Sequence, residues 1–128
     1  MASWDDLGSF VRVRYEIMRQ REGELWFNLP TNERTQIVAV RLVTGEDHHP
    51  WAQITSPVGR LGQVDLTRAI QMAAAPVTGG LVAENDLVLF RHSIPLGDTA
   101  LDGFDRAFRL VVDVADRMEH ELTGADQH

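Results

Sequence analysis

The pattern of polar and apolar positions first predicts a short helix near the start of the chain. Ser3 followed by Asp6 has the form of a capping box. Leu7, Phe10 and Val11 then recur at helical spacing. We therefore expect a helix that begins just after Ser3.

The pattern changes to a period of two after this helix. Apolar and charged residues alternate here in the order Val11, Arg12, Val13, Arg14, Tyr15, Glu16 and Ile17. Such alternation is typical of a half-buried strand. The expected boundary between helix and strand lies near Val13.

Apolar runs separated by turn residues predict a meander of three strands. The first run covers residues 25–29 and ends at Pro30, and the second covers residues 37–43 and is rich in β-branched side chains. The third begins at Trp51 and is expected to end at the breakers Pro57, Gly59 and Gly62.

A second helix and a hairpin are predicted next. Asp65 is a suitable N-cap for a helix over residues 66–75, which Pro76 ends. The hairpin pairs residues 80–83 with residues 87–94 across a turn at Glu84, Asn85 and Asp86.

The last helix has the clearest pattern in the chain. Thr99 is its expected N-cap, with Asp102 closing a capping box, and Gly124 is its expected stop. Apolar residues recur at spacings of three and four, at Leu101, Phe104, Phe108, Val111, Ala115, Met118 and Leu122. The tail over residues 125–128 is expected to be frayed.

These elements predict a single α+β domain over residues 1–124. Counted without the short alternating segment that ends at Ile17, their order is α-β-β-β-α-β-β-α. Because strands joined by short turns pair antiparallel, the expected fold is a five-stranded antiparallel sheet with the helices packed on it. A chain of 128 residues with 44% hydrophobic residues suits one ordinary core.

Composition removes several classes of function. The chain has no cysteine, so disulfides, thiolate nucleophiles and cysteine-ligated zinc are excluded. It shows no signal-peptide pattern and no apolar run of the ~18 residues that a membrane span needs, so we expect a cytoplasmic protein without a membrane partner. The net charge of −7 disfavours nucleic acid, because acidic surfaces repel phosphates.

Motifs that carry chemistry are weak in this sequence. His48 and His49 are adjacent and point in different directions, so they are not expected to share a metal. No Gly-x-Ser-x-Gly motif is present, and residues 56–62 lack the Gly-Lys-Ser/Thr of a phosphate loop. We expect no catalytic residue, no cofactor and no metal, with an enzyme of dispersed active site as the least favoured alternative.

Two segments carry a family resemblance. Residues 88–96 look like a strand that ends in Arg-His-x-x-Pro-Leu, and residues 115–124 form a helix end that looks typical of actinobacterial members. On these motifs and its order of elements, the chain resembles the YbjN-like group, within the type III secretion chaperone-like (CesT-type) fold. The resemblance spans most of the chain and is sharpest over residues 81–124. The chain departs from the pattern at residues 73–79, where a polar helix end is expected.

The resemblance implies a homodimer that binds an extended or partly unfolded peptide, with no catalytic residue. Tryptophan is enriched at binding hot spots, and an extended client adds main-chain bonds to a free sheet edge or places apolar anchors in grooves. The candidate client contacts are Trp26, Phe27, Val38, Val40 and Trp51. The candidate dimer contacts on the middle helix are Leu66, Ile70 and Met72. The alternative is a regulatory or stress-response subunit that modulates a folded partner.

Overall fold

The computed structural model describes residues 3–31, 33–97 and 99–123. Its three helices are α1 (Trp4–Arg14), α2 (Leu66–Met72) and α3 (Leu101–Leu122). Its strands are β1 (Arg19–Arg21), β2 (Glu24–Thr31), β3 (Arg34–Thr44), β4 (Pro50–Arg60), β5 (Leu81–Glu84) and β6 (Leu87–Pro95). The predicted helix stop at Gly124 and the predicted frayed tail lie outside the described residues.

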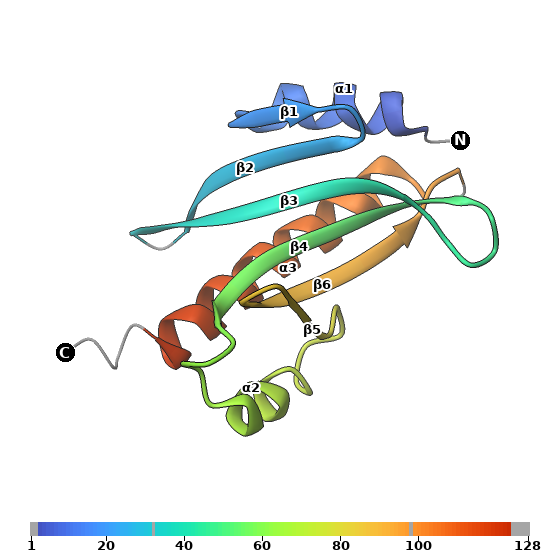
Figure 1. The fold of residues 1–128 in the computed structure, drawn as a ribbon. Coiled ribbons are helices and arrows are strands. Elements are labelled where there is room, and N and C mark those ends of the chain that lie inside the picture. The colour runs from blue at the N-terminus through green and yellow to red at the C-terminus, as the bar shows by residue number, and fades with distance from the viewer. Residues whose placement is uncertain (1–2, 32, 98, 124–128) are drawn as a thin grey trace.

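All the strand pairs are antiparallel, in the order β1-β2-β3-β4-β6-β5. The predicted α+β class with an antiparallel sheet is therefore confirmed. The described residues form six strands instead of the predicted five, because a short edge strand, β1, precedes β2. Figure 1 shows α3 lying across one face of this sheet, with α1 near the β1 edge and α2 beyond the far end of β4.

The strand predicted from near Val13 to Ile17 is wrong, because α1 continues to Arg14 and the first strand begins only at Arg19. The capping box at its start is confirmed: Ser3 and Asp6 exchange two hydrogen bonds of 3.1 Å. Leu7 and Val11 are fully buried one turn apart, whereas Val13 is 88% exposed. Burial thus follows the helical period here. Val13, which continues the two-residue alternation in the sequence, is exposed to solvent.

The core lies between the sheet and α3. Alternate strand residues face the helix, because side chains along a strand point to opposite faces. The register places Phe27 opposite Val38, and Val40 opposite both Leu25 and Ile54. The helix supplies the predicted stripe, with six buried members: Phe104, Phe108, Val111, Ala115, Met118 and Leu122.

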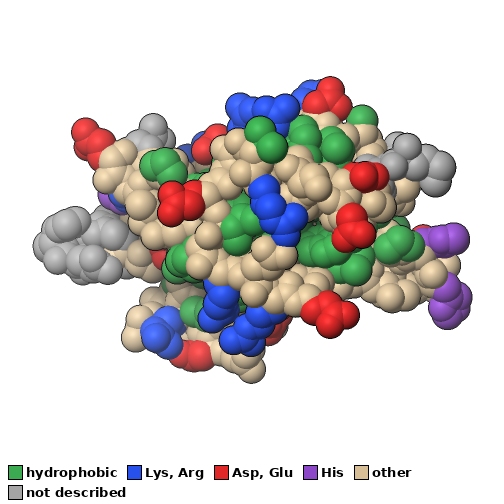
Figure 2. Space-filling model, turned by 90° about the horizontal axis from the view of Figure 1, so that it is seen from above, with side chains coloured by type: hydrophobic (Ala, Val, Ile, Leu, Met, Phe, Trp, Pro, Cys, Tyr) green, Lys and Arg blue, Asp and Glu red, His purple; other side chains and the backbone are tan. Residues whose placement is uncertain are grey.

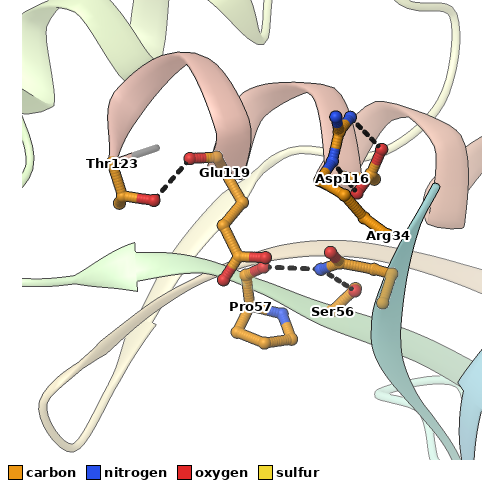
Figure 3. A network of polar contacts seen from close by, with 7 residues as sticks. Arg34, Ser56, Pro57, Asp116, Glu119 and Thr123 are labelled. Carbon is orange, nitrogen blue, oxygen red and sulfur yellow. Dashed lines mark hydrogen bonds and ion pairs between the residues drawn. The ribbon is translucent and has the colours of Figure 1, made fainter. Parts of the chain in front are cut away.

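Pro57 does not end the third predicted strand, because β4 runs on to Arg60 with a bulge between Pro57 and Gly59. The ladder between β3 and β4 stops at the pair Ala39 and Thr55. Beyond it, the Gln36 amide donates to Ser56 Oγ at 2.9 Å and to the Pro57 carbonyl at 2.8 Å (Figure 3). Hydrogen bonds of the Gln36 side chain thus replace backbone ladder bonds where β3 and β4 separate. The absent N–H of Pro57 therefore leaves no gap in the β3–β4 ladder.

Two predicted helix ends also need correction. The middle helix ends at Met72, with Ala73 as its C-cap, and does not reach Ala75. Thr99 is not the N-cap of α3, because Ala100 occupies that position without a side-chain bond. The Asp102 carboxylate instead accepts a hydrogen bond from the Gly103 N–H at 3.1 Å.

Candidate functional site

The outer edge of β2 is only partly covered by β1. The pairing of β1 with β2 spans residues 19–21 and 24–26, whereas β2 runs on to Thr31 (Figure 1). Over residues 27–31, β3 is the sheet neighbour that the register gives β2. A stretch of strand edge is therefore left without a second neighbour among the described residues.

The direction of the backbone groups on this edge follows from one hydrogen bond. The Trp26 carbonyl accepts from the Met18 N–H at 2.8 Å, so it points away from β3. Backbone groups alternate direction along a strand, so both the N–H and the carbonyl of Asn28 point to the same open side. Pro30 presents a carbonyl there but no N–H, a feature that limits uncontrolled edge pairing.

A groove opens beside this edge. It has a volume of about 720 Å³, within the usual range for binding sites. Its walls come from three parts of the chain: the segment after α1, the uncovered part of β2 and the middle of α3. The lining residues include Ile17, Met18, Leu29, Pro30, Val112 and Asp113. The groove thus combines apolar surface with strand-edge groups that have no backbone partner among the described residues.

Tyr15 fixes one wall of the groove to α3. Its hydroxyl donates to the Asp105 carboxylate, and Arg109 donates to the same carboxylate at 2.9 and 2.6 Å. Its ring lies 6.2 Å from the Phe27 ring and 5.0 Å from the Phe108 ring, measured between centroids. Burial, and then the bond to Asp105, raise the pKa of Tyr15. The groove wall is therefore a packed, hydrogen-bonded unit.

The surface around this edge is mixed in character. Figure 2 views the molecule from the α1 and β1 side and shows hydrophobic side chains exposed between acidic and basic ones. Met18 is a large apolar residue of the groove and is 52% exposed. Apolar side chains of the groove are thus accessible from solvent.

The five predicted client contacts are placed in two different environments. Phe27, Val38 and Val40 are fully buried under α3, so a partner reaches them only if that helix moves away. Trp26 and Trp51 are partly buried on the face of the sheet opposite α3. The structure does not bring these five residues together into one surface.

Trp26 is held by polar neighbours. Its Nε1 donates to Glu24 at 2.5 Å, and the guanidinium carbons of Arg19 and Arg41 lie 4.8 and 5.5 Å from its ring centroid. Trp51 donates to Asp47 at 3.1 Å and so braces the loop between β3 and β4. Both indoles therefore have local partners that explain their positions.

The three predicted dimer contacts are all on α2. Ile70 is 64% exposed and Leu66 is 42% exposed, while Met72 is partly buried against the core. The exposed pair is separated by one turn and lies on one side of the helix. Within the part of the chain that the structure describes, these two side chains form an exposed apolar surface.

Sequence reasoning missed the groove residues Ile17, Met18, Asn28, Leu29 and Val112. The sequence pattern predicts a strand at residues 15–17, where the structure has the connection that forms one wall of the groove. The available signal was Pro30 near the end of an apolar strand, because proline in a sheet is confined to edges and bulges. The position of α3 beside that edge is a tertiary feature without a local signal.

Among residues 3–31, 33–97 and 99–123, no group of three His, Asp or Glu side chains is placed to hold a metal ion. His92 accepts the Gly79 N–H at Nδ1 over 3.0 Å, and burial lowers the pKa of His92. In the same described part of the chain, no helix is long and apolar enough to cross a membrane.

Comparison with known proteins adds no assignment. No family model matches the chain, and no curated protein matches it.

Proposed function

We propose that the protein is a non-enzymatic, chaperone-like peptide-binding module that acts as a homodimer. The observation that carries this proposal is the uncovered edge of β2 beside an open groove. An extended segment gains main-chain hydrogen bonds from the edge and side-chain contacts from the groove, which is strand addition in the usual sense. The resemblance to secretion chaperones supports the same reading.

The client strand lies alongside residues 27–31, continuing the line of β1. A carbonyl of the client accepts a hydrogen bond from the Asn28 N–H, and N–H groups of the client donate to the carbonyl oxygens of Asn28 and Pro30. Alternate side chains of the client enter the groove, where they meet Leu29 and Val112. The other side chains face the side of the sheet opposite α3.

The second part of the proposal concerns the dimer. Leu66 and Ile70 are exposed apolar residues on α2, far from the groove in the fold (Figure 1). A second copy that covers these side chains removes apolar surface from water and leaves the β2 edge free. Dimer formation and peptide binding are therefore compatible on one chain.

Substitution at Asn28 tests strand addition. Asn28→Pro removes an N–H that points away from β3, so it removes no bond of the existing ladder. Asn28→Ala is the matched control, because it removes the side chain and keeps the N–H. The probe is a fluorescent eight-residue peptide that alternates leucine and threonine, and binding is followed by anisotropy.

We expect Asn28→Pro to weaken binding of this probe about 10-fold, the value of one lost hydrogen bond. We expect Asn28→Ala to bind within about 2-fold of the unsubstituted protein. Equal affinity for all three proteins, with folding confirmed by circular dichroism, would refute strand addition at this edge. A folded partner that binds all three equally supports the regulatory-subunit alternative instead.

A further inference from the structure

Two acidic side chains stand at the groove without an ion-pair partner among the described residues. Glu16 and Asp113 both line the groove and both are exposed. None of the ion pairs between described residues includes either of them. Their charges are therefore available to a bound segment.

The two arginines that line the groove each have a contact within the chain, but only Arg109 is in an ion pair between described residues. Arg109 is paired with Asp105 at 2.6 Å, and Asp105 itself is buried. The guanidinium of Arg14 lies over the Phe10 ring, 4.2 Å from its centroid. The groove lining itself carries two carboxylates and two guanidinium groups, and the carboxylate of Asp105, which is outside the lining, is the one paired with Arg109. The chain as a whole has a net charge of −7.

Apolar and acidic side chains line the same groove. Leu29 on β2 and Val112 on α3 line it, and Asp113 follows Val112 directly on the helix. A side chain that suits both kinds of surface has an apolar stem and a positively charged head. Lysine and arginine have this character, because an aliphatic stem carries a charged head.

We propose that the groove selects extended segments with lysine or arginine at the alternate positions that face it. The stems of these residues lie against Leu29 and Val112, and their charged heads lie beside Glu16 and Asp113. This refinement rests on the proposed strand addition and adds the chemistry of the client. The acidic surface increases the association rate of such segments and disfavours acidic ones.

Three fluorescent eight-residue peptides test this selection. They alternate threonine with arginine, with glutamate or with leucine, and binding is measured by anisotropy at low ionic strength. We expect the arginine peptide to bind about 10-fold more tightly than the glutamate peptide. The difference should shrink as added salt screens exposed charges.

Single substitutions locate the effect. Asp113→Asn and Glu16→Gln should each weaken the arginine peptide about 3-fold, as expected for one exposed ion pair, and leave the leucine peptide unchanged. Glu46→Gln is the matched control, because it removes one negative charge from the exposed loop between β3 and β4. It should change binding of the arginine peptide less than 2-fold.

The outcomes separate this refinement from the function on which it rests. Equal binding of the arginine and glutamate peptides, or an equal loss with Glu46→Gln and Asp113→Asn, would overturn the selection for basic residues. If the leucine peptide still depends on the Asn28 N–H in that case, strand addition stands. If none of the three peptides binds, both proposals fail.

Discussion

The hydroxyl of Tyr15 donates a hydrogen bond to Asp105, which lies 90 positions later in the sequence. This bond joins the connection after α1 to the first half of α3. The same carboxylate accepts two hydrogen bonds from Arg109. The buried Asp105 therefore binds both Tyr15, in the groove wall, and Arg109, one turn later on α3. The width of the groove therefore depends on this contact.

Tyr15→Phe should lower the free energy of unfolding by about 1–2 kcal/mol, because a buried carboxylate loses a donor. Urea denaturation at pH 7 measures this. The pKa of Tyr15 is raised in the folded protein, so its contribution is present below the unfolded value near 10 and is lost as the pH rises through the folded value. The difference between the two proteins should therefore narrow at strongly alkaline pH. An unchanged free energy at pH 7 would contradict the bond.

Asp116 and Glu119, three residues apart on α3, should have opposite effects on stability (Figure 3). Burial raises the pKa of Asp116, but the Arg34 hydrogen bonds of 3.1 and 2.7 Å, the Thr31 hydroxyl and the nearby positive charges together outweigh burial, so the pKa is lowered. Its contribution is thus present above the unfolded pKa and is lost as the pH falls through the folded one. Asp116→Asn should cost about 1–3 kcal/mol at pH 7 in urea denaturation.

The pKa of Glu119 is raised by burial and then by the charge of Asp116. Its favourable contribution is therefore lost as the pH rises through the folded value, and the ionised group is unfavourable at neutral pH. Glu119→Gln should raise the free energy of unfolding at pH 7, by roughly 0.5 kcal/mol. A loss of stability in Glu119→Gln at pH 7 would contradict this sign.

Gly79 and Gly80 offer a matched pair of substitutions before β5. Gly79 has a φ of +80°, and a Cβ there would lie 2.3 Å from the Phe90 ring, whereas a Cβ on Gly80 meets nothing within 4 Å. Gly79→Ala should cost about 1–3 kcal/mol, and Gly80→Ala less than about 1 kcal/mol. Thermal denaturation compares them, and equal midpoints would contradict the close approach to Phe90.

The proposed dimer predicts a mass of twice 14.4 kDa by light scattering. Ile70→Asp should reduce the mass to that of one chain, because it places a charge in the apolar surface of α2. Leu110→Asp is the control, since Leu110 is also an exposed apolar helix residue, at 43%, and lies on α3, outside α2. A monomeric unsubstituted protein, or a dimer unaffected by Ile70→Asp, would exclude α2 as the interface.

The sequence predicts the fold well where one local signal dominates. The capping box at Ser3 and Asp6 and the apolar stripe of α3 each place an element correctly. Prediction fails where tertiary structure decides. Val13 shares the two-residue alternation but remains in a helix, because burial of Leu7 and Val11 determines the conformation. Pro57 stays in a strand because Gln36, from another strand, supplies hydrogen bonds that no local pattern reveals.

The candidate site was less predictable than the fold. Hydrophobicity favoured Phe27, Val38 and Val40, yet the same property places them in the core. The groove depends on how far β1 covers β2 and on where α3 lies, and neither is encoded in a short segment. The aliphatic and acidic residues that line it are ordinary in type, so composition does not distinguish them.

Amide hydrogen exchange at Asn28 tests strand addition most directly. The Asn28 N–H points to the open edge, so it should exchange rapidly in the free protein. Saturation with the leucine–threonine peptide should slow its exchange at least about 10-fold and leave the loop amide of Gly62 unchanged. Unchanged exchange at Asn28 with the peptide bound would show that the segment binds elsewhere and would contradict the account.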